Sequence, residues 1–294
     1  MIFYQKKYLL VLVFYGIILK LTAQLNPKKL SENIATLTQI EENITSVHLN
    51  REVRITLIYP INVSKKWKVL IFNDGQDFEE LAMNSTISTL MSQKKVKDFI
   101  CVGIHANHDR LHEYGTASQA DYKKRGSKAK QHNDFIIKEL MPYLAKKYYI
   151  ADEGNVIAGL SLGGLSAMDI GWNNSNTFSK IGVFSGSFWW RQKSEEEGYT
   201  DENDRIMHNI IKSSTHKSGL SFWLEAGTED EESDRNHNGI IDAIDDTLDL
   251  INELEKKGYQ KNKEIVYQEI AGGKHNLPTW KKILPDFLLW AFGK

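Results

Sequence analysis

Several features that would narrow the function at once are scarce in this sequence. There is a single cysteine, Cys101, among 294 residues, so no disulfide can form within the chain. The formal net charge is −1, which argues against the basic surface that binds nucleic acid. No internal repeat, low-complexity tract or linker divides the chain. These absences predict one globular domain that binds no nucleic acid and needs no disulfide.

The N-terminus carries an uncharged apolar segment between lysines. Residues 8–19 form this segment, and the small residue Ala23 follows shortly after it. The order is typical of a secretory signal peptide, and the segment is short for a membrane span. We predict that residues 1–23 are a signal peptide cleaved after Ala23, with an uncleaved anchor as the alternative. Residues 24–294 then form a single domain that is periplasmic or secreted, with no stable membrane association after cleavage.

Strands and helices alternate along the chain after an antiparallel start. Val47–Asn50 and Val53–Tyr59 predict an opening hairpin. Segments typical of helices separate most of the later apolar runs, and this alternation predicts an α/β fold: a mostly parallel central sheet with helices on both faces. The later predicted strands are residues 67–72, 99–104, 156–158, 180–184, 220–226 and 265–270.

One short segment organises the predicted chemistry. The run Gly159-Leu160-Ser161-Leu162-Gly163 follows an apolar strand, precedes a helix of small residues and fits the G-x-S-x-G nucleophile elbow. The serine of such an elbow sits in a strained turn, where strand and helix pass so close that only glycine fits on either side. We predict that Ser161 is a nucleophile; a glycine-rich turn with an incidental serine is the alternative.

A serine nucleophile needs a base and an acid, which in this fold follow later strands in the order Ser, Asp/Glu, His. His275 follows the last predicted strand and is the candidate base. Asp230 follows the strand before it and is the candidate acid, with Glu229 and Glu231 as rivals. The residues expected to donate main-chain N–H groups to an oxyanion are Leu162 and Gln76.

Two further segments predict substrate contacts. Trp189 and Trp190 follow the strand after the elbow and are expected to line a pocket for aromatic or sugar groups, with core packing as the alternative. Arg110 lies in a long polar loop and is expected to anchor an anionic or polyhydroxylated group. A structural ion pair between Arg110 and Glu113 is the other interpretation.

The segment between the candidate acid and base matches the calcium loop of the EF-hand. Oxygen-bearing side chains stand at positions one, three, five, nine and twelve, with Gly239 at position six. An aspartate replaces the usual glutamate at position twelve, so weaker binding is expected. We predict a structural Ca²⁺ that helps to place the acid, and no cofactor for the chemistry; a solvated acidic loop is the alternative. The predicted ligands are Asp234, Asn236, Asn238, Ile240, Asp242 and Asp245.

These motifs together resemble the putative esterase family, which includes enterochelin esterases, S-formylglutathione hydrolases, feruloyl esterase modules and mycolyltransferases. The resemblance covers roughly residues 45–292. It is carried by the elbow, the turns at 73–76 and 272–275, the Arg110 loop and the run 185–190. Gly227-Thr228-Glu229-Asp230 resembles the acid turn of the feruloyl esterase modules, which favours Asp230. The calcium-like loop is no part of the family pattern.

The resemblance implies an α/β-hydrolase fold and cofactor-free hydrolysis of carboxylic esters. We therefore predict an exported serine esterase that forms an acyl-enzyme on Ser161. The expected partner is a small-molecule or glycan ester, either of siderophore type or an acetyl or feruloyl ester linked to carbohydrate. An acyltransferase of the same fold and a non-catalytic binding protein on a hydrolase fold are the alternatives.

Overall fold

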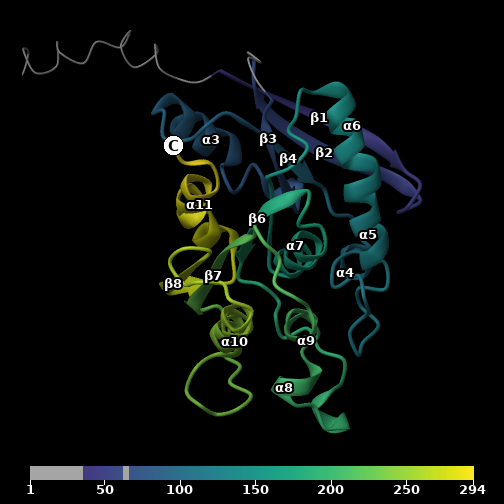
Figure 1. The fold of residues 1–294 in the computed structure, drawn as a ribbon, viewed down its shortest axis with the longest axis vertical. Coiled ribbons are helices and arrows are strands. Elements are labelled where there is room, and N and C mark those ends of the chain that lie inside the picture. The colour runs from purple at the N-terminus through teal and green to yellow at the C-terminus, as the bar shows by residue number, and fades with distance from the viewer. Residues whose placement is uncertain (1–35, 62–65) are drawn as a thin grey trace, which may run out of the picture.

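A computed structural model describes residues 36–61 and 66–294 of the chain. The predicted signal peptide, residues 1–23, lies outside the described residues. The described chain forms one eight-stranded sheet in the order β1-β2-β4-β3-β5-β6-β7-β8 (Figure 1). The α/β fold with a mostly parallel sheet is therefore confirmed.

The sheet has an antiparallel edge and a parallel body. The antiparallel strands β1 (Leu37–Ser46) and β2 (Arg51–Pro60) form the opening hairpin, and β2 pairs antiparallel with β4. The other neighbours pair parallel. These strands are β3 (Lys68–Asn73), β4 (Phe99–Ile104), β5 (Asn155–Leu160), β6 (Phe178–Phe184), β7 (Ser221–Glu229) and β8 (Ile265–Lys274).

The first strand of the hairpin differs from the prediction. Val47–Asn50, expected to be that strand, form the turn, and the strand itself lies earlier, in β1. Most of β1 is exposed or half-buried because it is the edge of the sheet. An edge strand with little burial carries little apolar alternation, so its sequence gives a weak signal.

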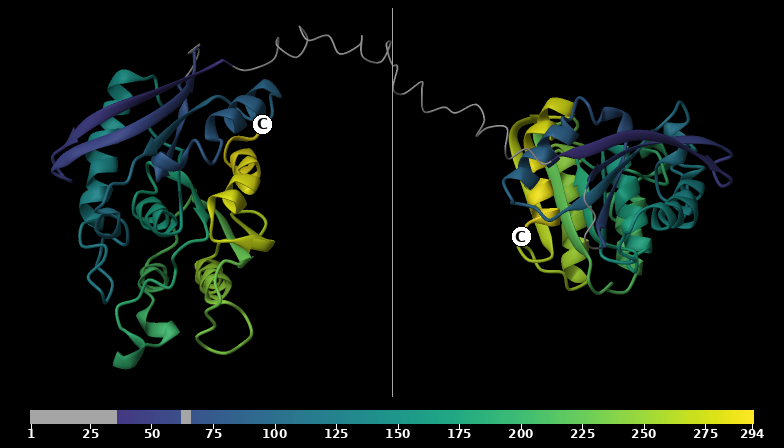
Figure 2. Two further views of the ribbon diagram at one scale, coloured as in Figure 1. Left: turned by 180° about the vertical axis from the view of Figure 1, so that it is seen from behind. Right: turned by 90° about the horizontal axis from the view of Figure 1, so that it is seen from above.

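Helices cover both faces of the sheet, and each face has its own apolar core. The helices α3 (Met83–Ser92) and α11 (Leu277–Phe292) pack on one face. Seen from above in Figure 2, α11 in yellow and the teal helices α5 and α6 lie on opposite sides of the strands. The helices of the second face are α5 (Ala129–Phe135), α6 (Met141–Lys147), α7 (Leu162–Asn173), α9 (Ile206–Ser213) and α10 (Asp242–Lys256).

Short helical segments complete the fold. A π-helical turn, η2, joins α5 to α6 just before Pro142, where the sequence predicted a kink in one long helix. None of the helices in the described ranges is both long and apolar enough to cross a membrane. The other short segments are η1 (Gly75–Asp77), α4 (Arg110–Glu113), η3 (Glu195–Glu197) and α8 (Asp201–Asp204).

The central strands explain where a site can form. All residues of β4 and β5 are buried, as expected for parallel strands covered on both faces. Cys101 lies in β4 with no exposed surface, and burial raises the pKa of its thiol, which fits the expected structural role. Because β3, β5, β6, β7 and β8 run parallel, the turns after their carboxyl ends gather at one edge of the sheet.

Candidate active site

Ser161 stands between β5 and α7 in a strained backbone conformation. Its φ is 54° and its ψ is −121°, a combination that serine rarely adopts. A Cβ atom on Gly159 would lie 2.3 Å from the main-chain oxygen of Gly163, and one on Gly163 would lie 2.7 Å from a carboxylate oxygen of Asp74. The close approach predicted for this strand–turn–helix is therefore present, and it leaves room only for glycine at both positions.

The imidazole of His275 contacts the serine hydroxyl. Its Nε2 lies 2.8 Å from Ser161 Oγ, although the two residues come from the turns after β8 and β5. Burial lowers the pKa of His275; the charge of Arg110 also lowers it, and the charge of Asp230 raises it. The neutral imidazole, which can accept a proton, is therefore favoured near neutral pH.

Of the three candidate carboxylates, Asp230 is the one placed behind His275. Its Oδ1 lies 4.0 Å from His275 Nδ1, and its side chain has no exposed surface. The main-chain N–H of Gly227 donates to the other oxygen at 3.2 Å. The separation from His275 exceeds hydrogen-bond length, but such contacts are often long in unliganded sites. Glu229 instead points to Lys274 at the surface.

The turn after β3 lies against the start of α7. Asn73 Nδ2 donates to the main-chain oxygen of Gly163 at 2.8 Å, which holds the turn beside the elbow. Gln76 belongs to η1 within this turn and is exposed. Leu162 is the first residue of α7, where a main-chain N–H has no acceptor within the helix. Both predicted oxyanion donors therefore border the same edge of the site.

Arg110 forms a different ion pair from the one suggested by the sequence. Its guanidinium makes two hydrogen bonds of 2.7 Å to the carboxylate of Asp74, which is 1% exposed. Glu113 pairs instead with Arg51, at 2.6 and 2.7 Å, so the Arg110–Glu113 interpretation is wrong. Arg110 is fixed near His275 by a residue of the Asn73–Gln76 turn. The sequence search missed Asp74, although that turn had been singled out.

The two adjacent tryptophans have different environments. Trp190 has no exposed surface and packs against the chain at Gly115 and Gly126, where a Cβ would lie 2.7 Å from its ring. The prediction that Trp190 contacts substrate is therefore wrong, and its alternative, core packing, holds. Trp189 is half-buried and forms part of a cavity wall. Adjacent residues in an extended loop point to different sides, which the sequence alone could not assign.

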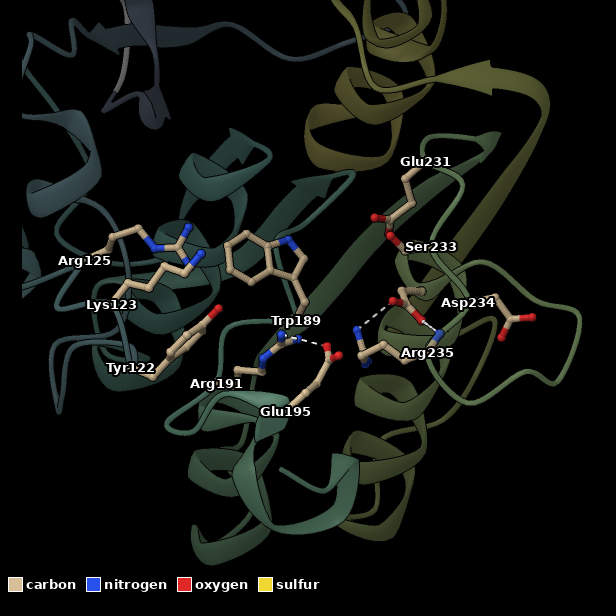
Figure 3. A pocket seen from close by; sticks show the side chains of 11 residues that line it. Tyr122, Lys123, Arg125, Trp189, Arg191, Glu195, Glu231, Ser233, Asp234 and Arg235 are labelled. Carbon is tan, nitrogen blue, oxygen red and sulfur yellow. Dashed lines mark hydrogen bonds and ion pairs between the residues drawn. The ribbon is translucent and has the colours of Figure 1, made fainter. Parts of the chain in front are cut away.

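The cavity beside the site has a volume of about 470 Å³. Figure 3 shows Trp189 between the basic residues of one wall and Glu231 on the other. The cavity adjoins the site through the chain, because Trp189 follows Ser187 closely and Glu231 follows Asp230. Burial and the charge of Asp242 raise the pKa of Glu231. The lining residues include Tyr122, Lys123, Arg125, Trp189, Arg191, Glu195, Glu231 and Arg235.

The cations of this cavity are mostly paired already. Arg191 pairs with Glu195 at 2.9 Å, and Arg235 pairs with Asp242 at 3.0 Å. Within the described residues, no carboxylate lies at ion-pair distance from the ammonium group of Lys123, which stands 5.4 Å from the ring centre of Tyr122. Lys123 is therefore the cation of this wall that a ligand can engage without breaking an ion pair.

The calcium-like loop brings most of its predicted oxygens together. The amide nitrogens of Asn236 and Asn238 lie 2.6 and 3.0 Å from Asp245 Oδ2. The carboxylate of Asp234 accepts from the main-chain N–H groups of Asn238 and Gly239 at 3.1 and 2.9 Å. A half-turn of each amide would exchange its NH₂ for its oxygen, so these four side chains can present oxygens to one ion.

Asp242 and Ile240 fit the predicted ligand set less well. Both oxygens of Asp242 are engaged by Arg235, through its main chain at 2.9 Å and its side chain at 3.0 Å, which corrects the expectation of a direct ligand. Ile240, whose side chain is 39% exposed, can offer only its main-chain oxygen. In the described ranges, His, Cys, Asp and Glu do not form a group of three that could hold a metal, so an ion here depends on asparagine and main-chain oxygens.

Two further polar residues beside Ser161 had no signal in the sequence. Ser187 Oγ lies 3.4 Å from Ser161 Oγ, and its main-chain N–H donates to the Ser161 oxygen at 3.2 Å. Glu225, in β7, has no exposed surface, and its carboxylate accepts from Ser185. A glutamate inside an apolar strand was the available signal for this second residue.

Comparison with family models gives a match over most of the chain. Residues 46–291 match the family described as Putative esterase. The chain belongs to the Putative esterase family. This esterase is 24% identical over 222 residues to the uncharacterized protein YjcH of Bacillus subtilis, which is 74% of this chain and 84% of the relative. It is 24% identical over 163 residues to the iron(III) enterobactin esterase of Dickeya dadantii, which is 52% of this chain and 33% of that protein.

Solved structures agree with the family. The enterobactin esterase of Shigella flexneri, crystallised with enterobactin, superposes with a TM-score of 0.69 at 19% identity. The match covers 86% of this esterase but 58% of that longer chain. A ferulic acid esterase superposes with a TM-score of 0.66 at 17% identity, over 87% and 98% of the two chains. These likenesses establish the α/β-hydrolase type of fold, as the sequence predicts.

Proposed function

We propose that this esterase is an exported serine hydrolase that cleaves a carboxylic ester through an acyl-enzyme on Ser161. The observation that carries the proposal is the 2.8 Å contact between Ser161 Oγ and His275 Nε2, made at a strained elbow. Asp230 would complete a Ser-Asp-His triad by orienting the imidazole and stabilising its protonated form.

The chemistry then follows from the positions of the groups. His275 Nε2 accepts the proton of the Ser161 hydroxyl as Oγ bonds to the ester carbonyl carbon. The carbonyl oxygen becomes an oxyanion, to which the main-chain N–H groups of Leu162 and Gln76 would donate. The protonated imidazole next gives its proton to the leaving alcohol. Water repeats the sequence on the acyl-enzyme, releases the acid and restores the hydroxyl.

The cavity beside Trp189 supports a substrate with a polar ring. The half-buried indole offers a flat apolar face, and Lys123 and Arg125 supply positive charge on the adjoining wall (Figure 3). Siderophore-type esters and acetyl or feruloyl esters on carbohydrate both present such a ring. Arg110, fixed by Asp74 near His275, would face a polar group of the bound ester.

Two measurements of the purified protein test the proposal. Wild type is expected to hydrolyse p-nitrophenyl acetate and to show a clear preference within a panel of catecholate and feruloyl esters. Ser161→Ala should lower kcat by roughly 10⁶-fold while retaining the melting temperature of the wild type. Turnover by Ser161→Ala near the wild-type rate would exclude the acyl-enzyme. Product partition between water and an added alcohol separates a hydrolase from an acyltransferase.

Export rests on the sequence of residues 1–23 alone. The expected mature N-terminus is Gln24. N-terminal sequencing of the protein recovered from the periplasm or medium of the producing cells checks this. A protein that stays with the cell pellet and begins at Met1 would contradict export.

We also propose that the loop from Asp234 to Asp245 holds a structural Ca²⁺. The convergence of Asp234, Asn236, Asn238 and Asp245 within hydrogen-bond distance of one another supports this set of ligands. The ion would neutralise the loop that follows Asp230 and so limit the movement of the acid, without taking part in the chemistry.

A further inference from the structure

β7 carries a carboxyl group that the proposed mechanism does not use. Glu225 has no exposed surface, and its Oε2 accepts from the main-chain N–H of Ser185 at 3.2 Å and from the Ser185 hydroxyl at 3.4 Å. Among the described residues its Oε1 has no hydrogen-bond partner. A buried carboxyl in this state costs free energy, so its position calls for an explanation beyond packing.

Ser185 links Glu225 to the helix beside the site. It follows β6 with a φ of 46°, in the left-handed region that serine seldom occupies. Its hydroxyl oxygen accepts from the indole N–H of Trp280 at 2.9 Å. Trp280 lies in α11 and is 6% exposed. The serine is thus held from one side by the carboxyl group and holds the indole on the other.

The indole of Trp280 in turn contacts the candidate base. The ring centres of Trp280 and His275 are 5.1 Å apart, and their planes meet at 78°, an edge-to-face arrangement. His275 is 40% exposed, and its separation from Asp230 exceeds hydrogen-bond length. Its ring therefore depends on this contact for its orientation more than a fully enclosed imidazole would.

We propose that Glu225 is a positioning residue for His275: as a neutral carboxyl group it fixes Ser185, Ser185 fixes the indole of Trp280, and the indole orients the imidazole that contacts Ser161. The inference rests on the proposed function of that site. Glu225 touches no reacting atom, so its effect passes entirely through Ser185 and Trp280.

The protonation of Glu225 agrees with this role. Burial, with a smaller contribution from the charge of Asp230, raises its pKa to about 8, although the hydrogen bonds from Ser185 act to lower it. Tyr267 on β8 is the other titratable group that interacts with this carboxyl, and its own pKa is raised, chiefly by burial. Above pH 8, ionised Glu225 would place a second negative charge beside Asp230 and weaken the arrangement around His275.

A residue that merely fills space would leave a different record. A filler replaced by an apolar side chain of similar size changes stability but not the pH profile of the site. A positioning carboxyl gives an alkaline limb of activity, and the amide that keeps its hydrogen bonds removes that limb. Trp280 supplies a matched partner, because Trp280→Phe keeps an aromatic ring and deletes the N–H that Ser185 accepts.

The test compares Glu225→Gln, Glu225→Leu and Trp280→Phe with wild type, using kcat/KM of p-nitrophenyl acetate and the imidazole NMR signals of His275 between pH 5 and 10. Glu225→Gln should stay within about twofold of wild type at pH 7 and lose the inflection near pH 8 in both readouts. Glu225→Leu and Trp280→Phe should each lower kcat by roughly 10- to 100-fold with little change in KM, and their combination should be far less than multiplicative.

The inference is overturned if Glu225→Gln keeps the alkaline inflection of the His275 signals, or if Trp280→Phe retains the wild-type kcat. If Glu225→Leu does not fold, Glu225→Gln and Trp280→Phe still decide the matter. Failure of the proposed function looks different: wild type would hydrolyse no ester. The NMR titration of His275 would still report whether Glu225 is coupled to its ring.

Discussion

The two sides of the Ser161 site are held in different ways. On the nucleophile side, main chain packs against main chain, and a Cβ on Gly159 would meet the Gly163 oxygen at 2.3 Å. On the acid side, Asp230 approaches His275 at 4.0 Å through side chains alone, and the loop that follows it is largely exposed. The first side tolerates almost no displacement, whereas the second can shift with its surroundings.

This difference has a chemical consequence. Attack by a serine needs its hydroxyl held to within a fraction of an ångström, which a strained turn between a buried strand and a buried helix provides. An acid that orients the base acts over a longer range, and its loss leaves part of the catalytic rate intact. We therefore expect substitutions on the two sides to fail differently: by lost charge on the acid side and by distorted geometry on the nucleophile side.

The largest expected effect on the acid side comes from Asp230→Asn. The amide keeps the shape but removes the charge that favours the correct tautomer and the protonated form of His275, so kcat should fall by roughly 10³- to 10⁴-fold. Steady-state kinetics at pH 7.5 measure this. Glu229→Gln is the matched control, because Glu229 points to Lys274 at the surface, and it should keep wild-type activity. The reverse ranking of the two variants would assign the acid to Glu229.

On the nucleophile side, Gly159→Ala tests the backbone contact. The added methyl group must displace the start of α7, so we expect roughly 100-fold lower kcat and a loss of about 1–3 kcal/mol of unfolding free energy. Gly219→Ala is the control, since a Cβ there would meet no atom within 4 Å and is opposed only by the positive φ of 85°. Equal loss of kcat in both variants would show that general destabilisation, and not the contact with Gly163, sets the rate.

The same contrast explains what the sequence could and could not predict. The elbow, His275 and Asp230 were predictable because each follows a strand directly, so local pattern and strand order place them together. Asp74 and Glu225 were not, because their partners Arg110 and Ser185 are distant in sequence and nothing local signals the pairing. Burial separates Trp189 from Trp190, and burial depends on the whole fold.

Calcium removal should affect the acid side alone. If the Asp234–Asp245 loop binds Ca²⁺, a 100-fold excess over Kd should raise the melting temperature by roughly 5 °C relative to chelated protein. Differential scanning fluorimetry with EDTA and with added Ca²⁺ measures this shift. Asp245→Asn should abolish it and leave the elbow intact, so that Ser161 keeps its reactivity. An identical melting temperature with EDTA and with Ca²⁺ would exclude the ion.

The smallest expected effect is on the acid limb of the pH profile. Burial and Arg110 lower the pKa of His275 below its usual 6.5, so the base stays neutral, and activity stays high, until the pH falls through that lowered value. Arg110→Gln removes the charge and should move the limb of kcat/KM upward, toward pH 6.5. Arg110→Lys keeps the charge and should leave it in place. A limb that does not move in Arg110→Gln would mean that burial alone sets the pKa.

The central claim is that Ser161 is a nucleophile activated by His275, and a fluorophosphonate probe tests it most directly. Intact-mass spectrometry of the folded protein should show a single adduct, and peptide mapping should place it on Ser161. The adduct should be absent from Ser161→Ala and form far more slowly in His275→Ala. A folded wild-type protein that takes no label at Ser161 would contradict the account.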